Sequence, residues 1–200
     1  MTDQSPSRPE GADPEKYRRL LEMAAGEFAR VGFERANVDT IAERARVGKG
    51  TVYLYFHNKA ALFHAVLAEV RRRLEAAGSG DHLAADAVIN LRTLIHEHLS
   101  LADAAPDLFR CYTSALFGVN RDFQEAALEI FDWQQEVLRE LLEQVGGRDN
   151  AETLDTRAAL LAGSLLAAAL VRGLRRRDDR DTDLEETALV HGFLAERRPA

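Results

Sequence analysis

The sequence predicts an all-α fold. Apolar residues recur at helical spacing along most of its 200 residues, and no stretch alternates between apolar and polar positions as half-buried strands do. Proline, glycine and polar clusters separate these periodic segments. We also find no internal repeat of about 20–50 residues.

The composition indicates a cytoplasmic protein without a membrane partner. Hydrophobic residues make up 46% and charged residues 30% of the chain, as in ordinary soluble proteins. With Cys111 as its single cysteine, the chain forms no internal disulfide, and a reducing compartment suits it. The first residues are polar and lack the apolar segment of a signal peptide. The longest apolar run, 158–171, is shorter than the roughly 20 residues that a membrane span needs.

We expect residues 1–12 to form a disordered tail and the first helix to start at Asp13-Pro14, a cap followed by proline. Gly32 should end this helix. Asn37 is a suitable cap for a short second helix. Residues 46–48 form a three-residue turn to a short third helix at 49–56.

Asn58 should cap a linking helix at 58–77, and the segment 76–80 ends it at the best domain boundary in the chain. Beyond this boundary we expect only helices, at 81–104, 107–119, 121–145, 152–177 and 183–197. The predicted organisation is a tail at 1–12, a first domain at 13–60 and a second domain at 81–200.

The short helix, three-residue turn and second short helix predict a helix-turn-helix, whose second helix enters the major groove of DNA. The net charge is −7, yet residues 16–59 carry nine Lys or Arg against five Asp or Glu, which favours an anionic partner for this part. Lys49 can reach a base edge or a phosphate, and the hydroxyls of Thr51, Tyr53 and Tyr55 suit phosphate oxygens. Gly50 allows close approach to DNA.

Lys59 lies in the first turn of the linking helix, where the helix dipole disfavours a cation and a bound phosphate would supply negative charge. Any one of these residues is also compatible with an ordinary solvated surface. The whole set is much better explained by a surface that meets a polyanion.

Residues 28–67, FARVGFERANVDTIAERARVGKGTVYLYFHNKAALFHAVL, resemble the DNA-binding domain of the TetR family of bacterial transcriptional regulators. The most specific part is the third helix, V-x-K-G-T-hydrophobic-Y, followed by F-x-x-K-x-x-L. The resemblance covers about a fifth of the chain. It implies a homodimer with two DNA-binding heads, and an all-helical body that binds a small, largely apolar effector and dimerises through its last two long helices.

The resemblance places Lys49, Gly50, Thr51, Tyr53 and Leu54 on the recognition helix. Tyr53, Tyr55 and Lys59 match positions that usually touch the phosphate backbone, and Asn37 and Val38 match the start of the second helix.

Three departures from the family pattern affect which operator sequence is bound. Arg46 replaces the usual turn glycine, so it either strains the turn or adds a phosphate contact. Leu54 favours a methyl contact with thymine over a hydrogen bond. Val38 lacks the usual hydroxyl.

Two regions of the body suggest sites without a signature of their own. An effector pocket or simply a core would explain the aromatic and apolar side chains of the middle helices, which are Phe109, Tyr112, Leu116, Phe117, Phe131 and Trp133. A small-residue stripe, Ala159, Gly163 and Ala167, fits either a dimer interface or internal packing. His96 and His98 point to different helix faces and make a poor metal pair.

The predicted function is therefore a ligand-responsive repressor that binds a palindromic operator of double-stranded DNA as a homodimer. We find no catalytic or metal-binding arrangement and expect no cofactor. The alternatives are a helical scaffold or adaptor protein and, less favoured, an enzyme. The linking helix is the expected lever between effector and DNA.

Overall fold

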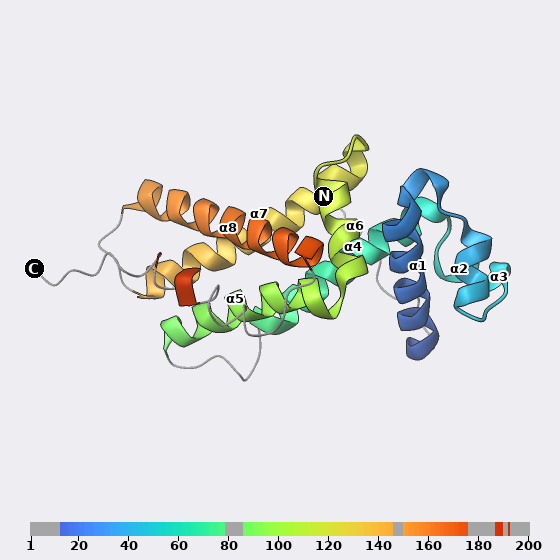
Figure 1. The fold of residues 1–200 in the computed structure, drawn as a ribbon, viewed down its shortest axis with the longest axis horizontal. Coiled ribbons are helices and arrows are strands. Elements are labelled where there is room, and N and C mark those ends of the chain that lie inside the picture. Colours follow the sequence, from blue (N-terminus) through green and yellow to red (C-terminus); the bar gives the residue numbers. More distant parts are fainter. Residues whose placement is uncertain (1–12, 79–85, 146–149, 176–186, 190–191, 193–200) are drawn as a thin grey trace, which may run out of the picture. The chain divides into compact units, whose positions relative to one another are not determined.

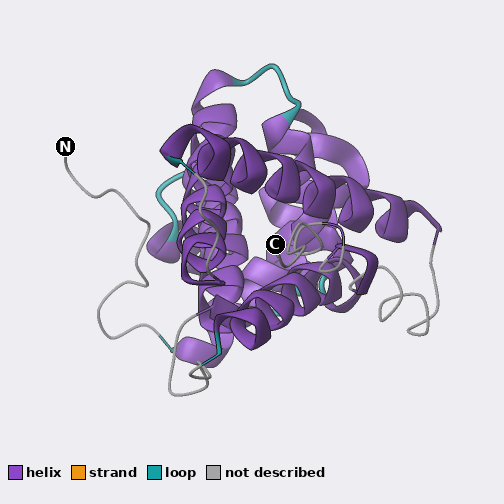
Figure 2. Ribbon diagram, turned by 90° about the vertical axis from the view of Figure 1, so that its left-hand side faces the viewer, coloured by secondary structure: helices purple, strands orange, loops and turns teal. Residues whose placement is uncertain are grey.

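A computed structural model describes residues 13–78, 86–145, 150–175, 187–189 and 192. Helices account for most of these residues, and Figure 2 shows no strand among them. The predicted all-α class is therefore confirmed. The expected tail at 1–12 and most of the expected helix at 183–197 lie outside the described residues.

The first four helices are α1 (Pro14–Arg35), α2 (Val38–Arg44), α3 (Lys49–Tyr55) and α4 (Lys59–Gly78), shown in Figure 1. Three predicted caps are confirmed. The side-chain oxygens of Asp13, Asn37 and Asn58 accept hydrogen bonds from backbone N–H groups in the first turns of α1, α2 and α4. Gly32 takes a left-handed backbone conformation with φ of 78° and interrupts α1, where the sequence predicted the helix to stop.

The later helices are α5 (Ala87–Ala104), α6 (Pro106–Leu116), α7 (Arg121–Val145) and α8 (Ala151–Arg175). The bounds of α7 agree with the prediction, but α5 and α6 differ from it. The side chain of Asp86 caps α5 by accepting from Val88 N at 2.8 Å, so that helix does not run from 81. α6 ends at Leu116 rather than 119, because the chain turns sharply at Gly118, where an added Cβ would lie 2.5 Å from Ser114 O.

The chain divides into two compact units. Unit 1 comprises Met1–Arg72 and Asp107–Ala127, and unit 2 comprises Arg73–Pro106 and Leu128–Ala200. Most of α6 and the start of α7 therefore group with the helix-turn-helix segment. The chain passes between the units three times, whereas the sequence suggested one link. The boundary predicted at 76–80 separates a DNA-binding part from an effector-binding part, and this functional division stays a prediction.

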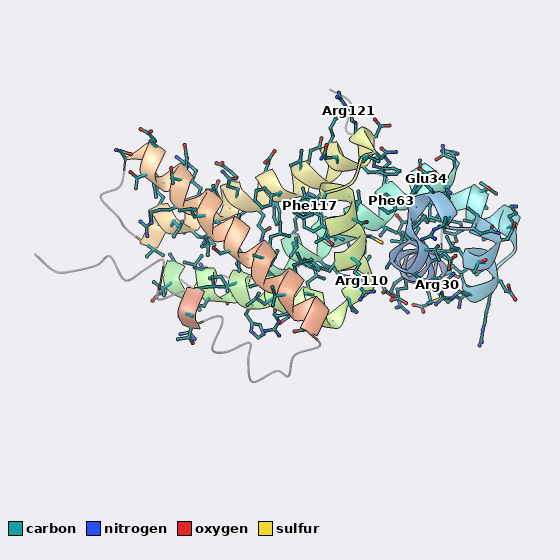
Figure 3. The ribbon with its side chains drawn as sticks, turned by 45° about the horizontal axis from the view of Figure 1, so that its top comes forward. Arg30, Glu34, Phe63, Arg110, Phe117 and Arg121 are labelled. Atoms are coloured by element: carbon teal, nitrogen blue, oxygen red, sulfur yellow. The ribbon has the colours of Figure 1, made fainter. Side chains whose placement is uncertain are left out.

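Unit 1 has an aromatic core. Apolar side chains of α4 are buried, and they include Phe63, labelled in Figure 3. The ring of Phe63 lies 5.0 Å from that of Phe28 and 4.5 Å from that of Phe123 at the start of α7. The Cys111 thiol of α6 donates to Ala25 O of α1 at 3.6 Å. These contacts hold α6 and the start of α7 against α1 and α4.

Unit 2 contains α5, α8 and most of α7, and α5 packs against α8. Leu161, Leu165 and Ala169 lie on the buried side of α8. Arg172 pairs with Asp103 at the far end of α5. By length and composition alone, α8 is also apolar enough to cross a membrane, over Ala151–Gly173. Such evidence is weak, because a core helix of a soluble protein passes the same test.

Candidate nucleic-acid interface

α2 and α3 form a helix-turn-helix on a small apolar core. Ile41 and Ala42 of α2 are buried, as are Val52 and Phe56 at α3. The turn between the helices is closed by Val47 N, which donates to Ala42 O at 3.0 Å. The buried residues thus fix one side of α3 to the protein and determine which of its side chains remain outside.

The turn contains a strained residue. Arg46 has φ of 55°, the left-handed region that glycine adopts without cost. Among the described non-glycine residues it is the one with positive φ. The predicted strain at this position is therefore present. The side chain of Arg46 is exposed, which leaves it available for the predicted phosphate contact.

The outer side of α3 carries the residues expected to meet DNA. Leu54 is 75% exposed and Tyr53 is 42% exposed, although both have large apolar surfaces. Gly50 is exposed, and a Cβ built on it would meet no atom within 4 Å. The protein itself therefore does not require glycine at this position.

Thr51 and Tyr55 lie at the edges of this outer side, and both are half-buried. The Tyr55 ring stacks on Tyr17 of α1 with centroids 6.2 Å apart. Tyr17 also stacks on Phe56 at 5.4 Å. Tyr55 is thus fixed against α1, which limits the positions that its hydroxyl can reach.

Lys49, the first residue of α3, forms an ion pair with Asp39 of α2. Its ammonium lies 2.9 Å from each carboxylate oxygen of Asp39. This hydrogen bond raises the pKa of Lys49. The sequence motif does not indicate a role for Asp39, although its position in the first turn of α2, beside the Asn37 cap, can be read from the sequence.

The N-terminus of α2 offers less to DNA than the sequence suggested. The Asn37 side chain is exposed but already accepts from Asp39 N at 2.8 Å. Val38 is buried. Both residues remain predicted DNA contacts.

Lys59 is half-buried and has partners within the protein. Its ammonium donates to Glu34 O at 3.0 Å and Ala36 O at 3.2 Å. It also lies 4.6 Å from the centre of the Phe33 ring. Lys59 therefore ties α4 to the end of α1, and its phosphate contact stays a prediction.

Unit 1 contains a buried carboxylate that the sequence did not predict. Glu27 of α1 is almost fully buried and pairs with Arg30 at 2.7 Å and Arg44 at 3.7 Å. Arg44 belongs to the last turn of α2. The pairing therefore links α1 to the helix-turn-helix, and its i, i+3 part was visible in the sequence as Glu27 and Arg30.

The residues predicted to line an effector pocket fall in both units. Phe109, Tyr112 and Leu116 are buried in α6, within unit 1. Phe117, labelled in Figure 3, follows α6 and is 70% exposed. Phe131 and Trp133 are half-buried on α7, within unit 2. This effector site stays a prediction.

Unit 2 contains a buried polar pair that the sequence analysis did not predict. His98 of α5 and Gln134 of α7 are both almost fully buried, and their Nδ1 and Nε2 atoms lie 2.7 Å apart. Burial lowers the pKa of His98 to about 4, so its ring is neutral near pH 7.

Among the described residues, no group of three His, Cys, Asp or Glu side chains is placed to hold a metal ion.

Comparison with known proteins gives a family match over the helix-turn-helix. Residues 20–66 match the model for "Bacterial regulatory proteins, tetR family". The chain is 46% identical over 56 residues to the HTH-type transcriptional repressor SCO4008 of Streptomyces coelicolor, covering 28% of this chain and 29% of the relative. It spans about a third or less of the length of the first curated relatives that it matches.

A longer match extends beyond the helix-turn-helix into the later helices. The chain is 27% identical over 146 residues to the fatty acid metabolism regulator protein of Bacillus subtilis, covering 72% of this chain and 75% of that protein. Among solved structures, it resembles the fatty acid degradation regulator FadR of Bacillus halodurans with a TM-score of 0.76 and 22% identity, covering 92% and 98% of the two chains.

It also resembles FadR of Bacillus subtilis in complex with stearoyl-CoA, with a TM-score of 0.68 and 21% identity, covering 88% and 98%. At these identities the solved structures show a shared fold. The two FadR proteins are described as regulators.

Proposed function

We propose that this chain, which belongs to the TetR family of bacterial regulatory proteins, represses transcription by binding a palindromic DNA operator in the cytoplasm. The observation that carries the proposal is the arrangement of α3. Val52 and Phe56 anchor the helix in the protein, while Leu54 and Tyr53 stay exposed beside Gly50. A helix held in this way presents one side to the major groove.

The side chains divide by the part of DNA that they would meet. Lys49 and Leu54 would reach base edges, where an apolar side chain favours the thymine methyl group. Tyr53, Tyr55 and Arg46 would contact phosphates and fix the position of α3 on the duplex. Thr51 and Asn37 lie at the margin of this surface and would add phosphate contacts.

A palindromic operator requires two heads, and we propose that α8 brings them together. Its outer face exposes Leu160 (60%), Leu170 and Val171, together with the small residues Gly163 and Ala167. An apolar face of this kind on a soluble chain favours association. A twofold dimer would place one recognition helix at each half-site, about 34–36 Å apart.

We propose a long-chain acyl-CoA thioester as the effector. The support is the likeness, over most of the chain, to a fatty acid metabolism regulator and to a FadR structure that contains stearoyl-CoA. The acyl chain fits the expectation of a largely apolar ligand. Because a ligand shifts an equilibrium only through unequal affinity for two states, it must favour a head arrangement that does not fit the operator.

The test of DNA binding is selection of duplexes from a randomised library, followed by fluorescence anisotropy with the selected site and with a random duplex. We expect preference for a palindrome and a steep fall in affinity with salt. Leu54→Ala should relax the preference at thymine positions, whereas His96→Ala on the outer side of α5 should not. Absence of sequence preference in the wild type would contradict the proposed function.

The effector is tested by thermal shift with short-, medium- and long-chain acyl-CoAs, with free coenzyme A and the free fatty acids as controls. A bound thioester should lower operator affinity by about 5–150-fold, the usual range of allosteric coupling. Binding without any change in operator affinity would contradict acyl-CoA as the effector and leave DNA binding intact.

A further inference from the structure

The ion pair between Lys49 and Asp39 lies on the surface that we propose for DNA. Asp39 is in the first turn of α2 and Lys49 is the first residue of α3, ten positions later. Both carboxylate oxygens lie 2.9 Å from the ammonium, so the lysine is held by two contacts at the junction of the helices. An ammonium has three N–H donors; one takes part in the hydrogen bond to Asp39 Oδ2, so a remaining donor can serve a partner elsewhere.

This pair contributes little to the stability of the fold. Its side chains are 52% and 55% exposed, and exposed ion pairs have small net effects because water and salt screen them. A carboxylate on a DNA-binding surface also repels phosphates. The helix dipole of α2 favours a carboxylate at this position, but it does not explain why the carboxylate is paired with Lys49 on the proposed DNA surface.

Resting on the proposed function, we propose that Asp39 is a specificity-determining residue that acts through Lys49. It neutralises the lysine towards the phosphates present in every sequence, and it holds the ammonium where its remaining donor can reach an operator base. The charge of Lys49 then adds little to sequence-independent binding. It contributes fully only where a base edge accepts its hydrogen bond.

The proposal predicts opposite effects on two kinds of DNA. In Asp39→Asn, Lys49 is released to bind phosphates, so affinity for a random duplex should rise and the salt slope should steepen by about one unit. Between about 50 and 200 mM salt, that variant should lose roughly 3.5-fold more affinity for random DNA than the wild type loses. Affinity for the selected operator should stay level or fall, so the ratio of operator to random affinity decreases.

Glu43→Gln is the matched control. Glu43 is exposed on the same helix, one turn beyond Asp39, and removing its charge changes the net charge by the same amount. It should leave the salt slope unchanged and shift both affinities alike. Asp39→Glu keeps the carboxylate and should restore the salt slope of the wild type. Asp39→Ser provides a second neutral variant should the asparagine variant fold poorly by circular dichroism.

The decisive comparison uses Lys49→Ala with and without Asp39→Asn, in the full-length protein. If Asp39 acts through Lys49, the effect of Asp39→Asn on the salt slope disappears when Lys49 is absent. The proposal is overturned if Asp39→Asn matches Glu43→Gln, or if its effect persists in the Lys49→Ala background. Wild-type protein that binds no DNA would instead overturn the proposed function, and this inference with it.

Discussion

At the residue scale, the partners of a side chain decide between roles that the sequence left open. Lys59 shows this most clearly. A cation in the first turn of α4 is opposed by that helix's dipole, and the sequence suggested a phosphate as compensation. The structure supplies a different one, because the ammonium donates to two backbone carbonyls near the end of α1. Two of its three donors are used by the carbonyls, and we expect the third to serve a phosphate.

Lys59→Met should therefore lower both stability and DNA binding. Losing two charge-assisted hydrogen bonds at a half-buried site should reduce the free energy of unfolding by about 1–2 kcal/mol. Loss of one phosphate contact should reduce the salt slope of DNA binding by about one unit. Chemical denaturation and salt titration measure the two effects, with Lys16→Met on the exposed start of α1 as control. A normal salt slope with lowered stability would confine Lys59 to a structural role.

His98 should make stability depend on pH. Burial lowers its pKa in the folded state to about 4, against an ordinary value near 6.5, so the unfolded chain takes up the proton first on acidification. The free energy of unfolding should then fall by about 1 kcal/mol per pH unit below about pH 6.5. Above that pH, both states are neutral and the contribution is constant.

The measurement is urea unfolding between about pH 7 and 5, above the range where carboxylates titrate strongly. His98→Leu should be less stable at pH 7, because it leaves Gln134 without this partner, but it should show a flatter pH dependence. His96→Gln, on the exposed side of the same helix, should keep the wild-type dependence. An equal slope in His98→Leu and the wild type would contradict burial of a neutral ring.

At the element scale, local signals predicted the fold well. Asp13, Asn37 and Asn58 cap their helices as expected, because an N-cap depends on a side chain and an amide two or three residues away. Where a helix end depends on packing, prediction was poorer. The end of α6 is set by a turn at Gly118, and apolar residues at 117 and 119 continued the helical pattern beyond it.

Long-range pairs in the candidate site could not be predicted from the sequence. The motif placed Lys49 and Leu54 on the recognition helix, but spacing along the chain does not show that Lys49 meets Asp39 ten residues earlier. The bond from Lys59 to Glu34 spans 25 residues. Such pairs follow from how helices pack, which periodicity alone does not determine.

Gly50 provides a test of α3 as a recognition element. Glycine inside a helix costs about 0.5–1 kcal/mol relative to alanine, and a Cβ at this position would meet no protein atom. Gly50→Ala should therefore stabilise the protein. If α3 lies close against DNA, the added methyl should also weaken operator binding, by roughly tenfold for a cost of about 1.4 kcal/mol.

Thermal unfolding and anisotropy measure the two effects separately. Gly173→Ala near the end of α8 is the matched control, because a Cβ there also meets no protein atom within 4 Å. It should gain stability with operator affinity unchanged. A Gly50→Ala variant that is more stable and binds the operator normally would show that this side of α3 does not approach DNA closely.

At the scale of the whole molecule, we expect the proposed effector response to reach the DNA-binding segment along the chain itself. The chain passes between them within α4, at the start of α6 and within α7. Phe123, at the start of α7, lies against Phe33 and Phe63 in unit 1. A change in α6 or α7 would therefore reach α1 and α4 directly, in addition to the lever that the sequence placed in α4.

The outer face of α8 yields the last prediction. Ala167→Arg places a long charged side chain in the middle of the face formed by Leu160, Gly163, Leu170 and Val171. If two copies meet there, the substitution introduces a charge twice across a twofold axis, and the dimer should dissociate. Light scattering after gel filtration should then give the mass of one chain. Ile89→Arg, at an exposed apolar residue of α5, should keep the dimer.

DNA binding distinguishes loss of the dimer from loss of the fold. A dimer binds a palindrome with both heads, and the second contact gains about 10²–10⁴-fold from effective concentration. Ala167→Arg should lose that factor on the full operator and bind an isolated half-site as well as the wild type does. Weakened half-site binding would indicate damage to the head instead. A variant that remains dimeric would show that the two chains associate through another surface.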